Sequence, residues 1–274
     1  MSAATLAPPR TRSRVWRELN GIVTVMARDL TITTKSLSGL VMSLVMPLLM
    51  MGMIGGNLKE NMAAGLGFDF GRFMLVGMLV NMLFMVTTMG MTTLVDDSDG
   101  NYSAELLVSP LSRYGIVLGK ILGSAVMAIV SCLGVLVVGA LMGISLTVGQ
   151  LLALLALAPL MCLSGGALAM IILGVIKSNK TANVAVMLIT MPQMFLSGVI
   201  IPIGQSTGVL WLLSRLLPMT YCVDLGRAAV YAGTPEYNSV VLFNPAVSLT
   251  AITVLTLGCL LAGTVLYVRS EKNR

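Results

Sequence analysis

Six long apolar runs restrict the fold of this chain more than any other feature of its sequence. They lie at about residues 37–56, 73–95, 116–143, 150–176, 181–203 and 246–268, and no charged residue falls in the middle of any of them. A helix rises about 1.5 Å per residue, so each run is long enough to cross the ~30 Å hydrocarbon core of a bilayer. Only 10% of the residues are charged, against roughly 25% in soluble domains. The sequence therefore predicts an all-α integral membrane protein with six transmembrane helices.

The rest of the chain is too apolar or too short to form a second domain. Residues 13–274 are thus predicted to be a single transmembrane domain. Residues 1–12, which contain Pro8 and Pro9, are expected to be a mobile tail and not a cleaved signal peptide. Between residues 13 and 34, apolar side chains recur every three or four positions, at Val15, Leu19, Ile22, Met26 and Leu30. This spacing predicts an N-terminal helix lying in the membrane interface.

Basic residues are distributed unequally between the two sides that six spans would create. The side of both termini would hold Arg10, Arg12, Arg14, Arg17, Arg28, Lys35, Arg113, Lys120, Lys177, Lys180, Arg269, Lys272 and Arg274. The opposite side would hold Lys59, Arg72, Arg215 and Arg227. Because basic residues accumulate in cytoplasmic loops, a multi-pass plasma-membrane protein with both termini in the cytoplasm is predicted. The net charge of +6 then reflects orientation and contact with anionic lipid, and nucleic acid is not an expected partner.

Two polar segments interrupt the apolar runs. The outer loop, at about residues 204–244, is not hydrophilic enough for a free loop; it predicts two short amphipathic helices, at 209–215 and 221–231, broken by Pro218. These would lie at the outer interface or dip back into the membrane. Residues 96–120 form a polar island in which Ser103 is a candidate N-cap and Pro110 lacks the N–H that a continuing helix needs. This island fits a short helix along the membrane face, and an ordinary solvated loop fits it about as well.

The residue types exclude several kinds of chemistry. The chain has no histidine, which rules out a Ser-His-Asp triad and a histidine metal site. No two of its four cysteines have metal-ligand spacing, so they are interpreted as small apolar side chains. Gly115 to Lys120 is one residue short of a P-loop and is followed by Ile121, so the chain is not expected to hydrolyse ATP. The apolar runs also lack ionisable groups that could couple transport to an ion gradient. No catalytic residue, metal ligand or bound cofactor is therefore assigned to this chain.

Two motifs resemble the type 2 permeases of ATP-binding-cassette (ABC) transporters. The first lies in the polar island and comprises Gly100, Glu105, Leu106, Leu107, Ser109, Pro110, Arg113, Gly119 and Lys120. The second lies in and around the outer loop and includes Ser197, Gly198, Pro202, Trp211, Pro218, Tyr221, Asp224, Arg227 and Gly233. Together they extend the resemblance over nearly the whole chain.

The resemblance implies the membrane subunit of an ABC exporter, most similar to the daunorubicin-resistance branch. In that family, two six-span permease subunits, identical or different, pair with two ATPase subunits, which bind the ATP and Mg. The motif from Gly100 to Arg113 would then be the region that couples this chain to the ATPase. Members of the family export drugs, lipids and polysaccharides.

Methionines form stripes along three of the apolar runs. The first stripe is Met42, Met46, Met50 and Met53, and the second is Met74, Met78, Met82, Met85 and Met89. A shorter set, Met187, Met191 and Met194, flanks Pro192 and Gln193, and Asn81 falls within the second run. Because methionine is flexible and polarizable, these stripes could line a substrate pathway for amphipathic or apolar compounds. They could equally be packing seams, and the amides could bond neighbouring helices.

Three functions remain after these exclusions. The first is an exporter subunit driven by a separate ATPase, moving drug-like or lipid-like compounds. The second is an ion-coupled carrier or channel acting alone, and the third is a membrane scaffold without transport.

Overall fold

The computed structural model describes residues 20–21, 23–24, 26–28, 31, 45, 49–55, 67–93, 113–176, 178–204 and 207–272. The predicted tail at 1–12, most of the predicted interfacial helix at 13–34, most of the first apolar run and most of the polar island lie outside these residues. The described residues between 20 and 31 are helical. The interfacial position of that helix stays a prediction.

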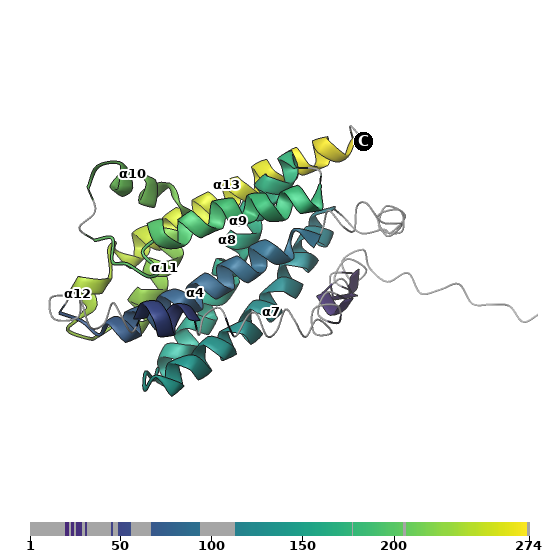
Figure 1. Cartoon of the computed structure of the whole chain (residues 1–274). Coiled ribbons are helices and arrows are strands. Elements are labelled where there is room, and N and C mark those ends of the chain that lie inside the picture. The colour runs from purple at the N-terminus through teal and green to yellow at the C-terminus, as the bar shows by residue number, and fades with distance from the viewer. Residues whose placement is uncertain are drawn as a thin grey trace, which may run out of the picture.

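Five long helices form the body of the molecule: α4 (Phe70–Gly90), α7 (Arg113–Leu141), α8 (Val148–Val175), α9 (Asn179–Leu196) and α13 (Pro245–Lys272). Figure 1 shows them side by side in one bundle, with the C-terminus at one end. Three short helices lie towards the other end: α10 (Gly208–Leu216), α11 (Pro218–Val230) and α12 (Tyr237–Val240). A π-helical turn, η1 (Met50–Gly55), is the largest described part of the first apolar run. All the elements in the described residues are helices, as the sequence predicts.

Local sequence explains where the helices begin and end. Asp69 caps α4 by accepting hydrogen bonds from the backbone N–H of Gly71 (2.9 Å) and Arg72 (3.4 Å). Thr147 and Gln150 form a reciprocal capping box at the start of α8. The sequence predicts a spanning helix over about residues 181–203, but helix α9 ends at Leu196. The predicted end of this helix is therefore wrong. The helix stops at Leu196 because the chain adopts φ of 77° at Gly198, a left-handed conformation that glycine tolerates.

Four described helical segments are long and apolar enough to cross a membrane: Phe70–Gly90, Val117–Leu141, Val148–Val175 and Tyr237–Leu266. A fifth span results if α10 and α11, which meet at a bend of 82°, count as one broken helix. Helix α9 is not among these segments, because Lys180, Asn183 and Gln193 lower its hydropathy. The prediction of a helical multi-pass membrane protein is confirmed, whereas the count of six spans stays a prediction.

Glycines let neighbouring helices approach closely on both sides of α8. A Cβ atom on Gly165 of α8 would collide with the carbonyl oxygen of Phe84 in α4. A Cβ on Gly263 of α13 would lie 2.7 Å from the backbone nitrogen of Ile171 in α8. These two contacts hold α8 tightly between α4 and α13, as small residues do in membrane bundles.

Candidate functional site

Helix α11 is the structural centre of the outer-loop motif. It packs against α4, α8 and α13, and eleven of its thirteen residues are buried. Pro218 lies at its first turn, where the missing N–H leaves no helical hydrogen bond unmade. The sequence predicts an amphipathic helix here, but the polar residues of α11 face protein instead of water. Packing on three sides, which periodicity within one helix does not encode, is the reason for this difference.

Asp224 joins α11 to the start of α13. One carboxylate oxygen, Oδ1, accepts a hydrogen bond from the backbone N–H of Leu242 at 2.6 Å. The other, Oδ2, accepts from the N–H of Phe243 at 3.2 Å and from the hydroxyl of Ser248 at 2.7 Å. The side chain is 1% exposed, so these three donors replace its hydration. Asp224 therefore holds the turn that leads into α13.

Arg227, one helical turn further on, joins α11 to the end of α9. Its Nη2 donates to the carbonyl oxygen of Gly198 at 2.6 Å and to that of Val199 at 3.4 Å. Its Cζ also lies 3.5 Å from the ring centroid of Phe73 in α4. Carbonyl dipoles and an aromatic face together stabilise this buried cation. A Cβ on Gly77 of α4 would collide with the Val199 carbonyl, so the turn after α9 is held from two sides.

A third polar connection, centred on Gln150, was not recognised in the sequence. Its Oε1 accepts from Nη2 of Arg72 at 2.9 Å and from the backbone N–H of Thr147 at 2.9 Å. Its Nε2 donates to the carbonyl of Val230 at 2.8 Å, at the end of α11. The T-x-x-Q pattern from Thr147 is a signature of a capping box, which concerns only contacts within the first turn of α8. The residues that Gln150 contacts in α4 and α11, Arg72 and Val230, are 78 and 80 residues away in the chain.

Tyr231 follows α11 and lies against the same group. Its side chain is fully buried, and Cζ of Arg72 is 5.6 Å from its ring centroid. Burial raises the pKa of Tyr231, so the phenol stays protonated at neutral pH. The other residues of the outer-loop motif differ in their burial and contacts. Ser197 is buried, Pro202 is half-buried, and the Tyr221 hydroxyl donates to the backbone carbonyl of Arg215 at 2.8 Å.

The seam between α4 and α9 contains amides with unmatched polar atoms. Nδ2 of Asn81 lies 3.7 Å from Sδ of Met194. Among the described residues, Oδ1 of Asn81 and both terminal atoms of Gln193 have no hydrogen-bond partner, although both side chains are buried. Thr190 differs, because its hydroxyl bonds the carbonyl of Val186 in its own helix. The two amides therefore keep hydrogen-bonding capacity inside the bundle.

The predicted methionine pathway is divided between core and surface. Met78 is 1% exposed and belongs to the main hydrophobic core, whereas Met82, Met85 and Met191 are half-buried. Met50 is half-buried in η1, and the neighbouring Met53 is 66% exposed. Met42 and Met46 lie outside the described residues. The pathway stays a prediction.

The predicted coupling residues lie almost entirely outside the part of the chain that the structure describes. Gly100, Glu105, Leu106, Leu107, Ser109 and Pro110 fall between residues 94 and 112, and Arg113 is described only as the first residue of α7. The described ends that flank this segment are Gly90 of α4 and the start of α7. Within the described residues, no three histidine, cysteine or acidic side chains gather as metal ligands would.

Comparisons with known proteins agree with this architecture. The model of the ABC-2 type transporter family matches residues 20–231, which is most of the chain. Nodulation protein J of Rhizobium meliloti (strain 1021) is 32% identical over 123 residues. That match covers 44% of this chain and 45% of the relative, so the aligned region is less than half of either protein. The family match shows that the chain belongs to the ABC-2 type transporter family, and its four helices able to span a membrane agree with that assignment.

Proposed function

We propose that this chain is the permease subunit of an ATP-driven exporter in the plasma membrane. It moves amphipathic or apolar compounds, drug-like or lipid-like, out of the cell. A second permease subunit and two copies of a separate ABC ATPase complete the transporter. The ATPase subunits bind ATP and Mg and supply the energy.

The observation that carries this proposal is that four described spans, Phe70–Gly90, Val117–Leu141, Val148–Val175 and Tyr237–Leu266, have no charged group in their interiors. They contain no aspartate or glutamate, and their basic residues, Arg72 and Lys120, lie near the ends. Asp224 and Arg227 of α11 are buried, but they hydrogen-bond groups of this chain, at Ser248 and Gly198. Carriers driven by protons or sodium generally place ionisable or ion-coordinating groups near the midplane. A transport permease without such groups needs an energy source on another subunit. This favours the ATPase-driven exporter over the ion-coupled carrier.

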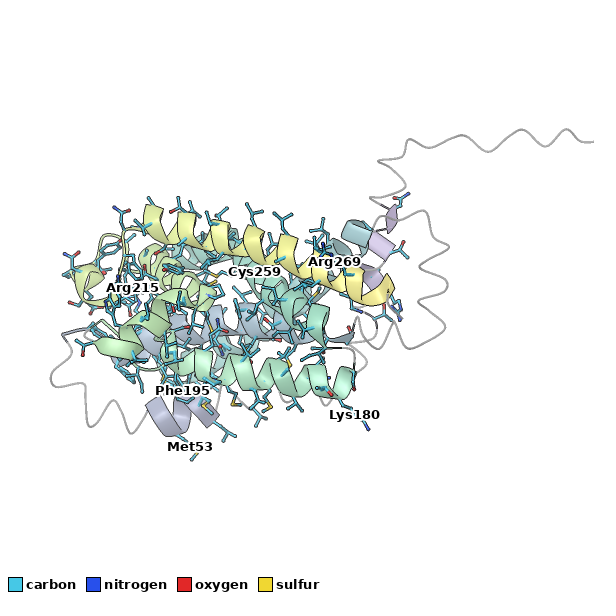
Figure 2. All side chains as sticks on the ribbon, turned by 90° about the horizontal axis from the view of Figure 1, so that it is seen from above. Met53, Lys180, Phe195, Arg215, Cys259 and Arg269 are labelled. Carbon is cyan, nitrogen blue, oxygen red and sulfur yellow. The ribbon has the colours of Figure 1, made fainter. Side chains whose placement is uncertain are left out.

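The positions of charged residues support the proposed orientation. Figure 2 places Lys180 and Arg269 at one end of the bundle and Arg215 at the other. The loop that follows α4 and precedes α7 begins and ends at the same end as Lys180 and Arg269. Basic residues mark the cytoplasmic side, so this loop faces the cytoplasm, where the ATPase binds. Both chain termini lie on that side in the proposed topology.

The substrate route runs along the seam of α4 and α9. Met82 and Met85 of α4 and Met191 of α9 are half-buried and offer adaptable apolar contacts. Asn81 and Gln193 offer uncharged hydrogen-bonding atoms without partners in the described residues. An amphipathic compound can satisfy both kinds of group. In the described parts of α4 and α9, the charged residues Arg72 and Lys180 lie near the helix ends, so a strongly charged compound finds no counter-charge on these helices midway along the seam.

The decisive experiment measures substrate-stimulated ATP hydrolysis by the ATPase that co-purifies with the chain. Glu105→Ala is expected to reduce stimulation while expression and membrane insertion persist, because a partner charge at the docking contact is left unpaired, at a cost of about 2–5 kcal/mol. Glu236→Ala is the matched control, because it removes the same charge at the N-cap of α12, where the Glu236 side chain makes no capping hydrogen bond. Transport that persists without any ATPase and collapses with an ionophore would establish the ion-coupled carrier instead. Co-purification without transport of any kind would favour the scaffold.

A further inference from the structure

Helix α10 is apolar on almost every side and is covered by little of the described chain. Of its nine residues only Ser214 is buried. Val209 is 73% exposed, Leu212 54% and Leu216 63%. In water such a helix would be unstable, but α10 adjoins α9 and α11 in a membrane-spanning bundle. The exposed faces of the neighbouring spans are apolar in the same way, as at Phe195 and Leu249, so α10 continues a lipid-facing surface.

Arg215 is the single charged residue of α10 and lies in its last turn. Its guanidinium carbon lies 4.0 Å from the centroid of the Trp211 ring and 5.1 Å from that of Phe243. Phe243 in turn packs on Tyr221, at 5.5 Å between ring centroids. The Tyr221 hydroxyl binds the Arg215 carbonyl at 2.8 Å. Two aromatic rings, from Trp211 and Phe243, therefore lie against this cation, and Tyr221 supports Phe243 and the Arg215 backbone.

Stacking on aromatic rings leaves the in-plane N–H groups of a guanidinium free for an acceptor. No carboxylate or other acceptor in the described residues is paired with the Arg215 side chain, which is exposed. Figure 2 places Arg215 at the end of the bundle opposite Lys180 and Arg269, where a spanning bundle meets the headgroup layer. Tryptophan and tyrosine concentrate at this level of a membrane. Arginine binds phosphate through paired, charge-assisted hydrogen bonds.

We propose that Arg215, held against Trp211 and Phe243, binds the phosphate of a phospholipid headgroup and so anchors α10 in the membrane interface. The apolar side chains of α10 enter the acyl region beside that headgroup. The interaction is independent of the transported compound, because it lies outside the seam of α4 and α9.

The test uses the fluorescence of Trp211. The chain has two tryptophans, so Trp16→Phe leaves Trp211 as the sole indole. The full chain, purified in a sugar-headgroup detergent, is titrated with dihexanoylphosphatidylcholine. We expect a saturable change in Trp211 emission as the phosphate binds next to the stacked guanidinium. Arg215→Gln is expected to weaken this response about tenfold or more. Arg215→Lys, which keeps the charge but loses the planar paired donors, is expected to lie between the two.

Four comparisons decide the outcome. Arg269→Gln, at the opposite end of the bundle, should titrate like the parent protein. If Arg215→Gln also titrates like the parent, with the same elution volume on gel filtration, Arg215 is not the ligand. If a phosphate-free glycolipid with the same acyl chains produces the same curve, α10 binds lipid through apolar contact alone. Saturation by inorganic phosphate at the same concentrations would assign the site to free phosphate and overturn the lipid anchor.

Discussion

Replacing Asp224 with alanine should destabilise the contact between α11 and the start of α13 by removing three hydrogen bonds at once. The carboxylate accepts from the N–H groups of Leu242 and Phe243 and from the hydroxyl of Ser248, at 2.6, 3.2 and 2.7 Å. A hydrogen bond to a charged group contributes about 1.5–3 kcal/mol. The three do not add fully, because the buried carboxylate also loses hydration on folding. We therefore expect Asp224→Ala to cost about 3–5 kcal/mol, the range found when one partner of a buried charged contact is removed.

Ser248→Ala is the matched control, because it removes only the hydroxyl from the same cluster. It should cost about 1.5–3 kcal/mol, since the other two bonds to the carboxylate remain. The double variant should lose less than the sum of the two single variants, because Ser248 has no carboxylate to bind once Asp224 is gone. The stability of Asp224→Asn should lie between that of the parent and that of the alanine variant. The amide keeps one acceptor oxygen but presents an NH₂ donor where the second carboxylate oxygen accepted hydrogen bonds.

Thermal unfolding in detergent, followed with a thiol-reactive dye, measures these differences. Cys162 and Cys222 are buried and free, so dye reaction with them reports the loss of tertiary structure. For a chain of this size, about 1 kcal/mol corresponds to roughly 2–4 °C in Tm. The Asp224→Ala shift should clearly exceed that of Ser248→Ala. Equal shifts would refute the reasoning, because the bonds from Leu242 and Phe243 would then contribute nothing.

Three further predictions concern packing, topology and substrate range. Gly263→Ala should lower the Tm, because the added Cβ meets the α8 backbone at a cost of about 1–3 kcal/mol. Gly258→Ala in the same helix is the control, because its Cβ would meet nothing within 4 Å and the change should be neutral or stabilising. Similar Tm shifts for the two variants would contradict the Gly263 contact. In a cysteine-free background, a cysteine at Ser206 should react with an impermeant reagent from outside and one at Ser103 should not, and the reverse pattern would invert the orientation. Replacing Met78, Met82 and Met85 together with leucine should change the free energy of unfolding by roughly less than 1.5 kcal/mol per site. It should narrow the range of exported compounds in a transport assay. An unchanged range at normal expression would favour a role for these methionines in helix packing.

Features that depend on neighbouring residues in the chain were predictable. The long apolar runs predicted the spanning helices α4, α7, α8 and α13, because crossing a bilayer requires length and hydrophobicity that are visible in one segment. Pro218 predicted the break between α10 and α11 for an equally local reason. The residues of the outer-loop motif also identified the family before any geometry was available.

Sequence alone determined that the chain is a helical membrane protein of the ABC-2 type transporter family, because hydrophobic length and short motifs are properties of single segments. Only the tertiary structure decided what Asp224 and Arg227 contact, since their partners at Ser248 and Gly198 are 24 and 29 residues away. The tertiary structure also distinguishes two glycines of α13: a Cβ on Gly263 would meet the backbone of α8, whereas a Cβ on Gly258 would meet nothing within 4 Å. The physical reason is that these contacts depend on how segments pack against one another, and no local spacing along the chain contains that information.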